Sequence, residues 1–342
     1  MGVVTEPQPS RRRATVHDVA REAGVSRGTV SRVLNGGYVS EQARAAIEAA
    51  IRTVGYVPNT AARNLVMQRS RAVGFIVHEP HALFLEDPNI GAIMLGANTV
   101  LSDADLQMVC LVTDSARDTE RVTRYLSGGF VDGVIIVSAR AADPITDAVV
   151  RLGVPAAFVG HPQTTVPLPW VGIDNFTAAR DITRQLAKTG RKRVGMVAAA
   201  LDRDSGADRL AGFKEALGDT FDPDLVVEIP LYEYTAGLRA TQELLERAPD
   251  VDGIFAASDA VAAGVLTALR RSGRTVPDDV GVVGFDDSSW AERCFPPLST
   301  VHQPAAGVGE RAAQLVVAQL AGQDVPRDGV LLDSPIVWRD SA

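Results

Sequence analysis

Eight short apolar runs, separated by amphipathic stretches, constrain the fold of this chain most strongly. They lie between residues 72 and 285 and read AVGFIV, LQMVCLV, VDGVIIV, PAAFVG, RVGMVA, LVVEIP, VDGIFAA and VGVVGF. Continuous apolar strands that alternate with helices are typical of parallel sheets covered on both faces. The segment VDGVIIVSA at Val131 is echoed by VDGIFAASD at Val251, which indicates two similar α/β halves.

Sheets of this kind bind ligands outside the carboxyl ends of their strands. Two halves that face each other would hold a ligand in the cleft between them, and the ligand would drive hinge closure.

A single enzyme domain with the same strand order is the alternative. The sequence contains no GxxxxGK[ST] loop, GxSxG elbow, HExxH or paired-cysteine motif. We therefore predict no enzymatic activity and no cofactor.

The 342 residues allow two or three domains with ample core. Five histidines and two cysteines, Cys110 and Cys294, show no metal-ligand spacing, so no metal site is predicted. So few cysteines suit a reducing compartment. No run of 18 apolar residues and no apolar signal core occur. We expect a cytoplasmic protein that does not contact a membrane.

The stretch from Thr15 to Leu65 has a different character, with short helical patterns at close spacing. Thr15 is placed to cap a first helix, and Ser26 to cap a second that ends near residues 35–37. A third helix is expected from about Ser40 to Val54, with glycine following it. Two helices joined by a tight glycine turn, the second of them polar and basic, form the helix-turn-helix pattern.

The second helix carries side chains suited to DNA. Arg27 and Arg32 can bond guanine in the major groove, and Asn35 can bond a base or a phosphate. Three hydroxyl side chains are donors suited to phosphates: Ser26, Thr29 and Ser31. A small helical bundle with a solvated basic face is the alternative interpretation.

The charge of the chain is divided sharply. Residues 10–71 hold eleven arginines against four acidic residues, a net charge of +7. Residues 72–342 hold 23 basic against 37 acidic residues, a net charge of −14. The basic charge is therefore concentrated where nucleic acid would bind, although the whole chain is acidic. The run Arg11 to Arg13 adds phosphate contacts or is a solubilising tail, and residues 1–14 are expected to be a disordered arm.

The segments TVHDVAREAGVSRGTVSRVLN and GYVPNTAARNL resemble the amino-terminal domain of the lactose/galactose repressor family. The resemblance implies that residues 59–67 form a hinge helix in the DNA-bound dimer and insert Leu65 into the minor groove, where an apolar wedge kinks the duplex. Asn59, Ala62 and Arg63 fall on contact positions of that helix. Thr15 and Gly28 complete the DNA-contacting candidates. Gly28 departs from the family pattern, because a base-reading position there has no side chain.

The resemblance continues to about Trp338 and implies an effector domain related to periplasmic sugar-binding proteins. In RDSGADRLAGF, the effector-contact positions are Arg203, Ser205 and Arg209, and Arg209 is expected to grip sugar hydroxyls or an acidic group. For Arg209 and Asp286 the alternative is a structural ion pair, and for Tyr232 it is plain packing. The resemblance also implies that Tyr232 stacks on the ligand and that Asp286 accepts hydrogen bonds from ligand hydroxyls or an amine. Ser258 and Gln303 are weaker matches, and Trp290 would form a wall of the pocket or pack between the halves.

The amino-terminal half of the cleft matches the family less closely. The segment HEPHALFLEDPNIGAI is longer than the usual strand-to-helix loop. We expect Asp87, Asn89 and Ile90 to enter the cleft and Glu79 to lie near its mouth. Ser138 follows another strand at the same edge. Many relatives carry a sugar-binding aspartate where this chain has Gly160. His161 follows, either as a substitute or as a solvent-facing loop residue.

We therefore predict an α/β effector domain of two parallel-sheet halves, preceded by a small all-α helix-turn-helix domain. The boundaries are expected at 1–14, 15–58 for the DNA-binding domain, 59–70 for hinge and linker, and 71–342. The resemblance implies a homodimer on a near-palindromic double-stranded operator, controlled by a carbohydrate as inducer or corepressor. A purine-sensing regulator and a transport solute-binding protein are the alternatives.

Overall fold

The computed structural model describes the chain except for five short stretches: residues 1–13, 35, 57–68, 141–142 and 162–165. The chain separates into two compact units, Met1–Gln68 and Arg69–Ala342, which we call the small and the large unit. The predicted arm, hinge helix and Asn35 lie outside the described residues, together with Asn59, Ala62, Arg63 and Leu65. None of the described helices combines the length and the apolar character needed to cross a bilayer.

The described residues of the small unit form three helices, and capping residues mark several of their ends. Thr15 forms a capping box with Asp18, in which the Asp18 carboxylate accepts the Thr15 backbone N–H at 2.9 Å. The Ser26 hydroxyl accepts the Thr29 N–H at 3.1 Å, and Gly55 ends the third helix in a left-handed conformation. The predicted helices are thereby confirmed as α1 (Val16–Glu22), α2 (Arg27–Leu34) and α3 (Glu41–Val54).

The three helices pack around a small apolar core. Val19, Val30 and Ile47, one from each helix, are fully buried in it. The opposite face of α2 therefore carries its polar and basic residues at the surface. Burying one face of the second helix leaves the other free to read DNA, as the helix-turn-helix pattern requires.

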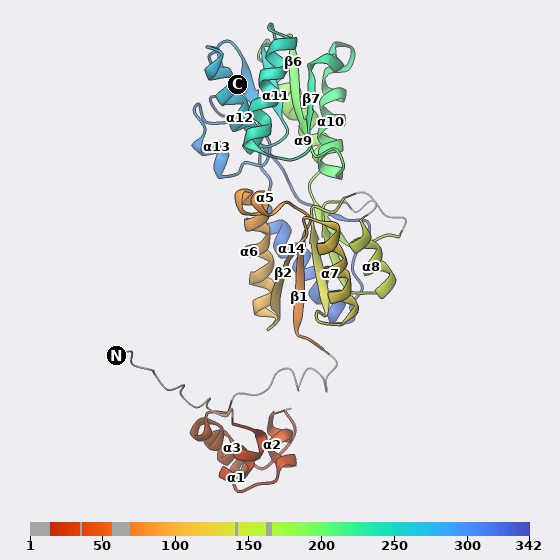
Figure 1. The fold of residues 1–342 in the computed structure, drawn as a ribbon, viewed down its shortest axis with the longest axis vertical. Helices are drawn as coiled ribbons and strands as arrows, with labels where there is room; N and C mark the ends of the chain where they lie inside the picture. Colours follow the sequence, from red (N-terminus) through yellow and green to blue (C-terminus); the bar gives the residue numbers. More distant parts are fainter. Residues whose placement is uncertain (1–13, 35, 57–68, 141–142, 162–165) are drawn as a thin grey trace, which may run out of the picture. The chain divides into compact units, whose positions relative to one another are not determined.

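The large unit has two α/β lobes, which Figure 1 shows as separate bodies. The sheet of the first lobe has the order β11-β5-β4-β3-β1-β2 with parallel pairs throughout. Its elements are β1 (Ala72–Val77), α5 (His81–Glu86), α6 (Pro88–Asp103), β2 (Gln107–Val112), α7 (Ala116–Ser127), β3 (Gly133–Val137), α8 (Pro144–Leu152), β4 (Ala156–Val159), β5 (Trp170–Gly172), α14 (Ala305–Leu320) and β11 (Val330–Leu331).

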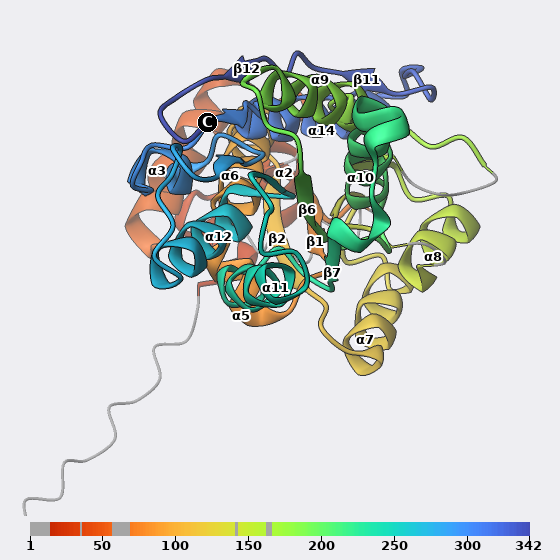
Figure 2. The same ribbon diagram turned by 90° about the horizontal axis from the view of Figure 1, so that it is seen from above.

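The second lobe has a parallel sheet of order β7-β6-β8-β9 and a small antiparallel pair, β10-β12. Figure 2 shows α10 and α12 on opposite sides of β6. Its elements are α9 (Asn175–Lys188), β6 (Val194–Ala199), α10 (Asp204–Leu217), η1 (Gly218–Thr220), η2 (Pro223–Leu225), β7 (Val226–Ile229), α11 (Tyr234–Arg247), β8 (Gly253–Ala256), α12 (Asp259–Arg271), β9 (Gly281–Val283), α13 (Ser289–Arg293), β10 (Thr300–Val301) and β12 (Ile336–Val337).

All eight apolar runs form strands of the two sheets, which confirms the prediction of two similar parallel-sheet halves. The segment after β1 differs from the expected long loop, because it contains the short helix α5 before α6 begins. The chain crosses between the lobes around residues 173–174, 302–304 and 332–335. These crossings allow the carboxyl ends of both sheets to face one cleft.

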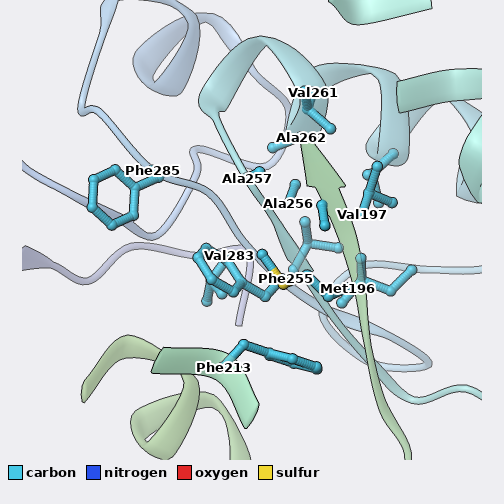
Figure 3. Packing of buried hydrophobic residues seen from close by; sticks show 14 of the residues in the cluster. Met196, Val197, Phe213, Phe255, Ala256, Ala257, Val261, Ala262, Val283 and Phe285 are labelled. Atoms are coloured by element: carbon cyan, nitrogen blue, oxygen red, sulfur yellow. The ribbon is translucent and has the colours of Figure 1, made fainter. Parts of the chain in front are cut away.

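Buried aromatic rings form the centre of the second lobe's core. The ring of Phe255 on β8 lies 6.3 Å from that of Phe213 on α10 and 6.5 Å from that of Phe285 after β9. Figure 3 shows these rings with part of the aliphatic cluster around β6. The first lobe has a separate apolar cluster on each face of its sheet, one under α6 and α14 and one under α7 and α8. Each sheet is therefore covered on both faces, as its apolar strands require.

The echoed VDG segments have the same structural role in the two lobes. The Asp132 carboxylate accepts the backbone N–H groups of Ser70 and Arg71, at 2.7 Å each. The Asp252 carboxylate accepts the N–H groups of the two residues directly ahead of β6. Each aspartate therefore fixes the start of the first strand of its own lobe.

Helices α6 and α14 cross at very short range because glycines lie at the crossing. A Cβ atom at Gly309 would lie 2.0 Å from the Ile93 carbonyl oxygen, and one at Gly96 would lie 2.1 Å from the Ala306 carbonyl oxygen. Only residues without a side chain permit this approach. The first lobe is thus held together by contacts that connect its beginning with a helix more than 200 residues later.

We expect Gly309→Ala to destabilise the large unit by about 1–3 kcal/mol, because the added methyl group must push backbone atoms apart. Gly307→Ala is the matched control on the same helix, since the nearest atom to its Cβ would be 3.7 Å away. The control variant should be neutral or up to about 1 kcal/mol more stable. Urea unfolding of both variants measures the difference. Equal stability of the two variants would contradict the close helix crossing.

Candidate functional site

A cavity of about 110 Å³ lies in the cleft between the two lobes of the large unit. Its walls come from the carboxyl ends of strands in both sheets, from the start of α6 and from the start of α10. The structure brings together eleven of the fourteen predicted effector residues in this lining: Glu79, Asp87, Asn89, Ile90, Ser138, Arg203, Ser205, Arg209, Tyr232, Asp286 and Gln303.

Arg209 on α10 is the most highly connected of these residues. Its Nε donates to Asn175 Oδ1 at 2.9 Å, and its Nη1 donates to the Ala257 carbonyl at 2.6 Å. Nη2 lies 3.4 Å from both Gln303 Oε1 and Asp286 Oδ1. The guanidinium is buried and stacks on the Phe285 ring, with Cζ 3.7 Å from its centroid. Its position is thus fixed without a ligand. The ion pair with Asp286, which was the structural alternative for this arginine, is present and is compatible with a role in binding.

Asp286 faces Arg209 from the segment after β9. Burial raises the pKa of its carboxyl well above the usual range, against the opposing effect of the Arg209 charge. Its backbone has a φ of 113°, and Ser138 in the facing lobe has a φ of 60°. Left-handed backbone at residues with side chains is uncommon and is concentrated at ligand sites. Both lobes therefore present a strained residue to the cavity.

Tyr232 contributes the aromatic surface of the cavity. The Arg209 Cζ lies 5.5 Å from its ring centroid, and its hydroxyl lies 3.1 Å from Ser205 Oγ. The ring is thus supported on one side by a cation and held at its edge by a hydrogen bond. The apolar side chains of Ile90, Ile93 and Val308 also line the cavity. The site can offer polar groups to hydroxyls and apolar surface to C–H groups.

Glu79 departs from the expectation that it lies near the mouth of the cleft. It is only 2% exposed and forms a two-pronged ion pair with Arg203, whose exposure is 3%. The second contact of this pair joins Arg203 Nη2 to Glu79 Oε2 at 3.1 Å. The pair connects the two lobes, because Glu79 follows β1 and Arg203 precedes α10. Burial of an arginine without such a partner would be very costly.

Asp87 caps α6 and lines the same cavity. Its Oδ1 accepts the Asn89 N–H at 2.8 Å, and this bond fixes the first turn of the helix. Burial raises the pKa of its carboxyl to about 6, and the negative charge of Glu79 acts in the same direction. The side chain is therefore an acceptor that binds a proton near neutral pH.

Three predicted effector residues lie outside the main cavity. Ser258 caps α12 through the Val261 N–H, and Trp290 stacks on Tyr234 with ring centroids 6.2 Å apart. These two line a smaller adjoining hollow that shares Asp87, Asn89, Tyr232 and Asp286 with the main cavity. His161 is exposed, and its ring packs edge-on against Trp170. His161 therefore lies at the surface, as the alternative of a solvent-facing loop residue predicts, and its ring contacts another side chain of the protein.

Two polar lining residues were not predicted. Asn175 begins α9 directly after a lobe crossing and accepts the hydrogen bond from Arg209. Asp204 begins α10 and accepts a hydrogen bond from the His161 backbone N–H. Burial raises the pKa of the Asp204 carboxyl. The position of Asp204 between two predicted residues was a signal for it, whereas Asn175 follows a capping aspartate and looks like part of a helix start.

The small unit presents the other candidate site. Arg27, Gly28, Ser31 and Arg32 are exposed on α2. Thr15 and Ser26 are capping residues at exposed helix starts, and the Thr29 hydroxyl lies 2.9 Å from Ser26 Oγ. The capping bonds use some of the hydroxyl groups predicted to contact phosphates, so helix stability accounts for these residues as well.

Replacing Asp87 with asparagine tests the burial of this carboxyl. A carboxyl with a higher pKa in the folded state contributes stability below its unfolded pKa and loses that contribution as pH rises through its folded pKa. With a pKa of about 6, Asp87 should lower the unfolding free energy by about 2 kcal/mol between pH 4 and pH 7.5. Asparagine also caps helices but carries no charge. Asp87→Asn should therefore be more stable than the unsubstituted protein at pH 7.5 and about equally stable at pH 4.

Urea unfolding at the two pH values measures this difference. Asp174→Asn is the control for a capping substitution, because Asp174 accepts the Thr177 N–H at the exposed start of α9. The interpretation fails if Asp87→Asn leaves the pH dependence of stability unchanged.

Residues 15–59 match the model for bacterial regulatory proteins of the lacI family, and residues 183–342 match the periplasmic binding protein-like domain. The transcriptional regulator CelR of Thermobifida fusca is 40% identical over 97% of this chain and 99% of its own length. The transcriptional repressor CytR of Escherichia coli strain K12 is 31% identical over 96% of each chain.

Solved structures give the same result. A CelR–cellobiose complex matches with a TM-score of 0.77 and 38% identity, over 96% of this chain and 100% of that one. A lac repressor dimer bound to operator and the anti-inducer ONPF matches with a TM-score of 0.85, at 24% identity over 96% of this chain and 99% of that one, which shows the fold. The chain belongs to the lacI family of bacterial regulators and is a DNA-binding transcriptional regulator with an effector-binding domain, not an enzyme.

Proposed function

We propose that this regulator is a repressor whose affinity for its operator is set by a neutral sugar bound in the cleft. The observation that carries the proposal is the pairing of charges in the cavity. Both cavity arginines already face carboxylates, Arg203 with Glu79 and Arg209 with Asp286. A phosphate or carboxylate ligand needs an available cation, whereas sugar hydroxyls need acceptors and donors.

The remaining groups of the cavity suit a polyhydroxyl ligand. Asp87 and Asp204 add acceptors, and Ser138 and Ser205 add hydroxyls. Tyr232, the one aromatic residue among the described lining residues, offers a face to the C–H side of a sugar ring. A planar purine is usually held between two flat groups, and the lining supplies one. These features favour a sugar over the purine alternative.

The CelR relative supports a choice of first ligand. Its structure was solved with cellobiose, and the two chains align over nearly their whole lengths. We therefore propose cellobiose or a related glucose oligosaccharide as the effector. Whether the sugar acts as an inducer or as a corepressor, effector and operator change each other's affinity by the same factor.

The DNA-binding half of the proposal rests on the exposed face of α2. Two copies of α2 in a homodimer would occupy successive major grooves of a near-palindromic operator. Arg27 and Arg32 would read bases, while the net charge of +7 on residues 10–71 attracts the phosphate backbone. Exposed leucines at Leu85 on α5 and Leu95 on α6 offer an apolar surface for the dimer. We propose that the protein acts in the cytoplasm.

Titrating an operator complex with sugars tests the effector. An operator selected from random DNA is bound at fixed salt and titrated with cellobiose, related disaccharides, glucose 6-phosphate and purine bases. We expect cellobiose or a related disaccharide to change operator affinity at least tenfold, a coupling of about 1.4 kcal/mol. The phosphorylated sugar and the bases are the controls. A response to a purine alone would refute the sugar proposal, while the assignment as a DNA-binding regulator would stand.

Substituting Arg32 tests how the operator is read. Arg32→Ala should reduce the preference for operator over scrambled DNA by about 1–3 kcal/mol, the value of one two-pronged base contact. Arg32→Lys is the matched control, because it keeps the positive charge but not the fork of donors. The lysine variant should lose preference while keeping the salt dependence of binding. Unchanged operator preference in both variants would show that Arg32 does not read bases.

A further inference from the structure

One carboxylate in the lining of the cavity was not among the predicted effector residues. Asp204 is the first residue of α10 in the second lobe, and it lines the cavity beside Arg203, Ser205 and Arg209. It does not cap its helix, because the capping position is Arg203, which makes no side-chain capping bond. A half-buried carboxylate needs a reason to be kept at a cavity wall, since burial disfavours its charge.

The backbone at Gly160 makes room for this carboxylate. Gly160 follows β4 in the first lobe and has a φ of 85°, a conformation that favours glycine. A Cβ atom there would lie 3.0 Å from Asp204 Oδ2 and 3.1 Å from Asp204 Oδ1. A side chain at position 160 and the carboxylate of Asp204 would therefore compete for one space. In this chain the second lobe fills it.

The carboxylate is held at this position by the opposite lobe. The His161 backbone N–H donates a hydrogen bond to Asp204 Oδ2. The two residues before Asp204 make cross-lobe contacts as well, Asp202 with Arg140 at 3.4 Å and Arg203 with Glu79. Three consecutive residues thus contact the segments that follow three adjacent strands, β3, β1 and β4. An acceptor fixed in advance costs little further ordering when a ligand binds.

We propose that Asp204 is a specificity-determining residue of the effector site, at which its carboxylate accepts hydrogen bonds from hydroxyl groups of the sugar. A carboxylate can accept about four hydrogen bonds, and the backbone N–H groups of His161 and Ser205 use part of that capacity, so capacity for ligand hydroxyls remains. This inference rests on the proposed sugar-binding function. It also places the acceptor on the lobe that carries Arg209 and Tyr232.

The same geometry predicts which ligands are rejected. An anionic group at this wall would lie next to the Asp204 carboxylate and would be repelled by it. A sugar that lacks the hydroxyl at this position would leave the remaining acceptor capacity of this half-buried carboxylate unused, which lowers affinity. Asp204 therefore selects for a hydroxyl at one ring position and against a phosphate or carboxylate there.

The test uses isothermal titration of the full-length protein with cellobiose and its monodeoxy derivatives. Asp204→Ala removes the acceptor, and Asp204→Asn keeps the shape while removing the charge. Asp208→Asn is the matched control, because Asp208 lies one turn later on α10, is exposed and does not line the cavity. Thermal unfolding of each variant shows whether it is folded, and the asparagine variant serves if the alanine variant is not.

We expect Asp204→Ala to weaken cellobiose binding about tenfold to a hundredfold, with a smaller loss for Asp204→Asn and less than about twofold for Asp208→Asn. One monodeoxy derivative should bind the unsubstituted protein weakly, yet lose little further affinity for Asp204→Ala. A structural effect of the substitution would not single out one hydroxyl, so this coupling identifies direct contact.

Two results would overturn the inference in different ways. If the unsubstituted protein binds cellobiose and Asp204→Ala binds it equally well, or loses the same factor with every derivative, Asp204 is not a ligand contact and the proposed function stands. If the unsubstituted protein binds neither cellobiose nor any other sugar tested, the sugar-binding function fails and the role of Asp204 fails with it.

Discussion

The large unit is organised around one buried guanidinium. Arg209 on α10 reaches α9 through Asn175, the end of β8 through the Ala257 carbonyl, and a lobe crossing through Gln303. Burial raises the pKa of the Asp286 carboxyl, and the positive charge of Arg209 acts against this rise. A buried cation must be surrounded by acceptors, so the segments that supply them are drawn to one point. The cavity is the space left beside that point.

The sequence allowed the elements to be predicted with few errors, because their signals are local. Capping hydroxyls and a following glycine marked the three described helices of the small unit, and short apolar runs marked eight strands of the two parallel sheets. The short helix α5 was missed, because the segment HALFLE has too few residues for a helical period to be seen. Local patterns therefore predict the long helices and the strands well. They predict poorly whether a loop contains a short helix.

The cavity was harder to predict in detail because its contacts join distant residues. The resemblance identified most of the lining, but nothing near Glu79 in the sequence indicates that Arg203, 124 residues later, buries it. Likewise, Gly160 looked like the loss of a side chain, while the structure fills that space from the other lobe with Asp204. A change at one position can be compensated by a residue that only the fold brings near.

The hydrogen bonds from Ser70 and Arg71 to Asp132 have a mechanical consequence. These two residues are where the chain enters the effector unit from the linker, and the carboxylate of the first lobe holds both of their amides. Such a tether joins Ser70 and Arg71 to the first lobe, so a displacement of that lobe also displaces the point at which the chain enters it. Signals between the two units of the regulator therefore begin from a fixed attachment point.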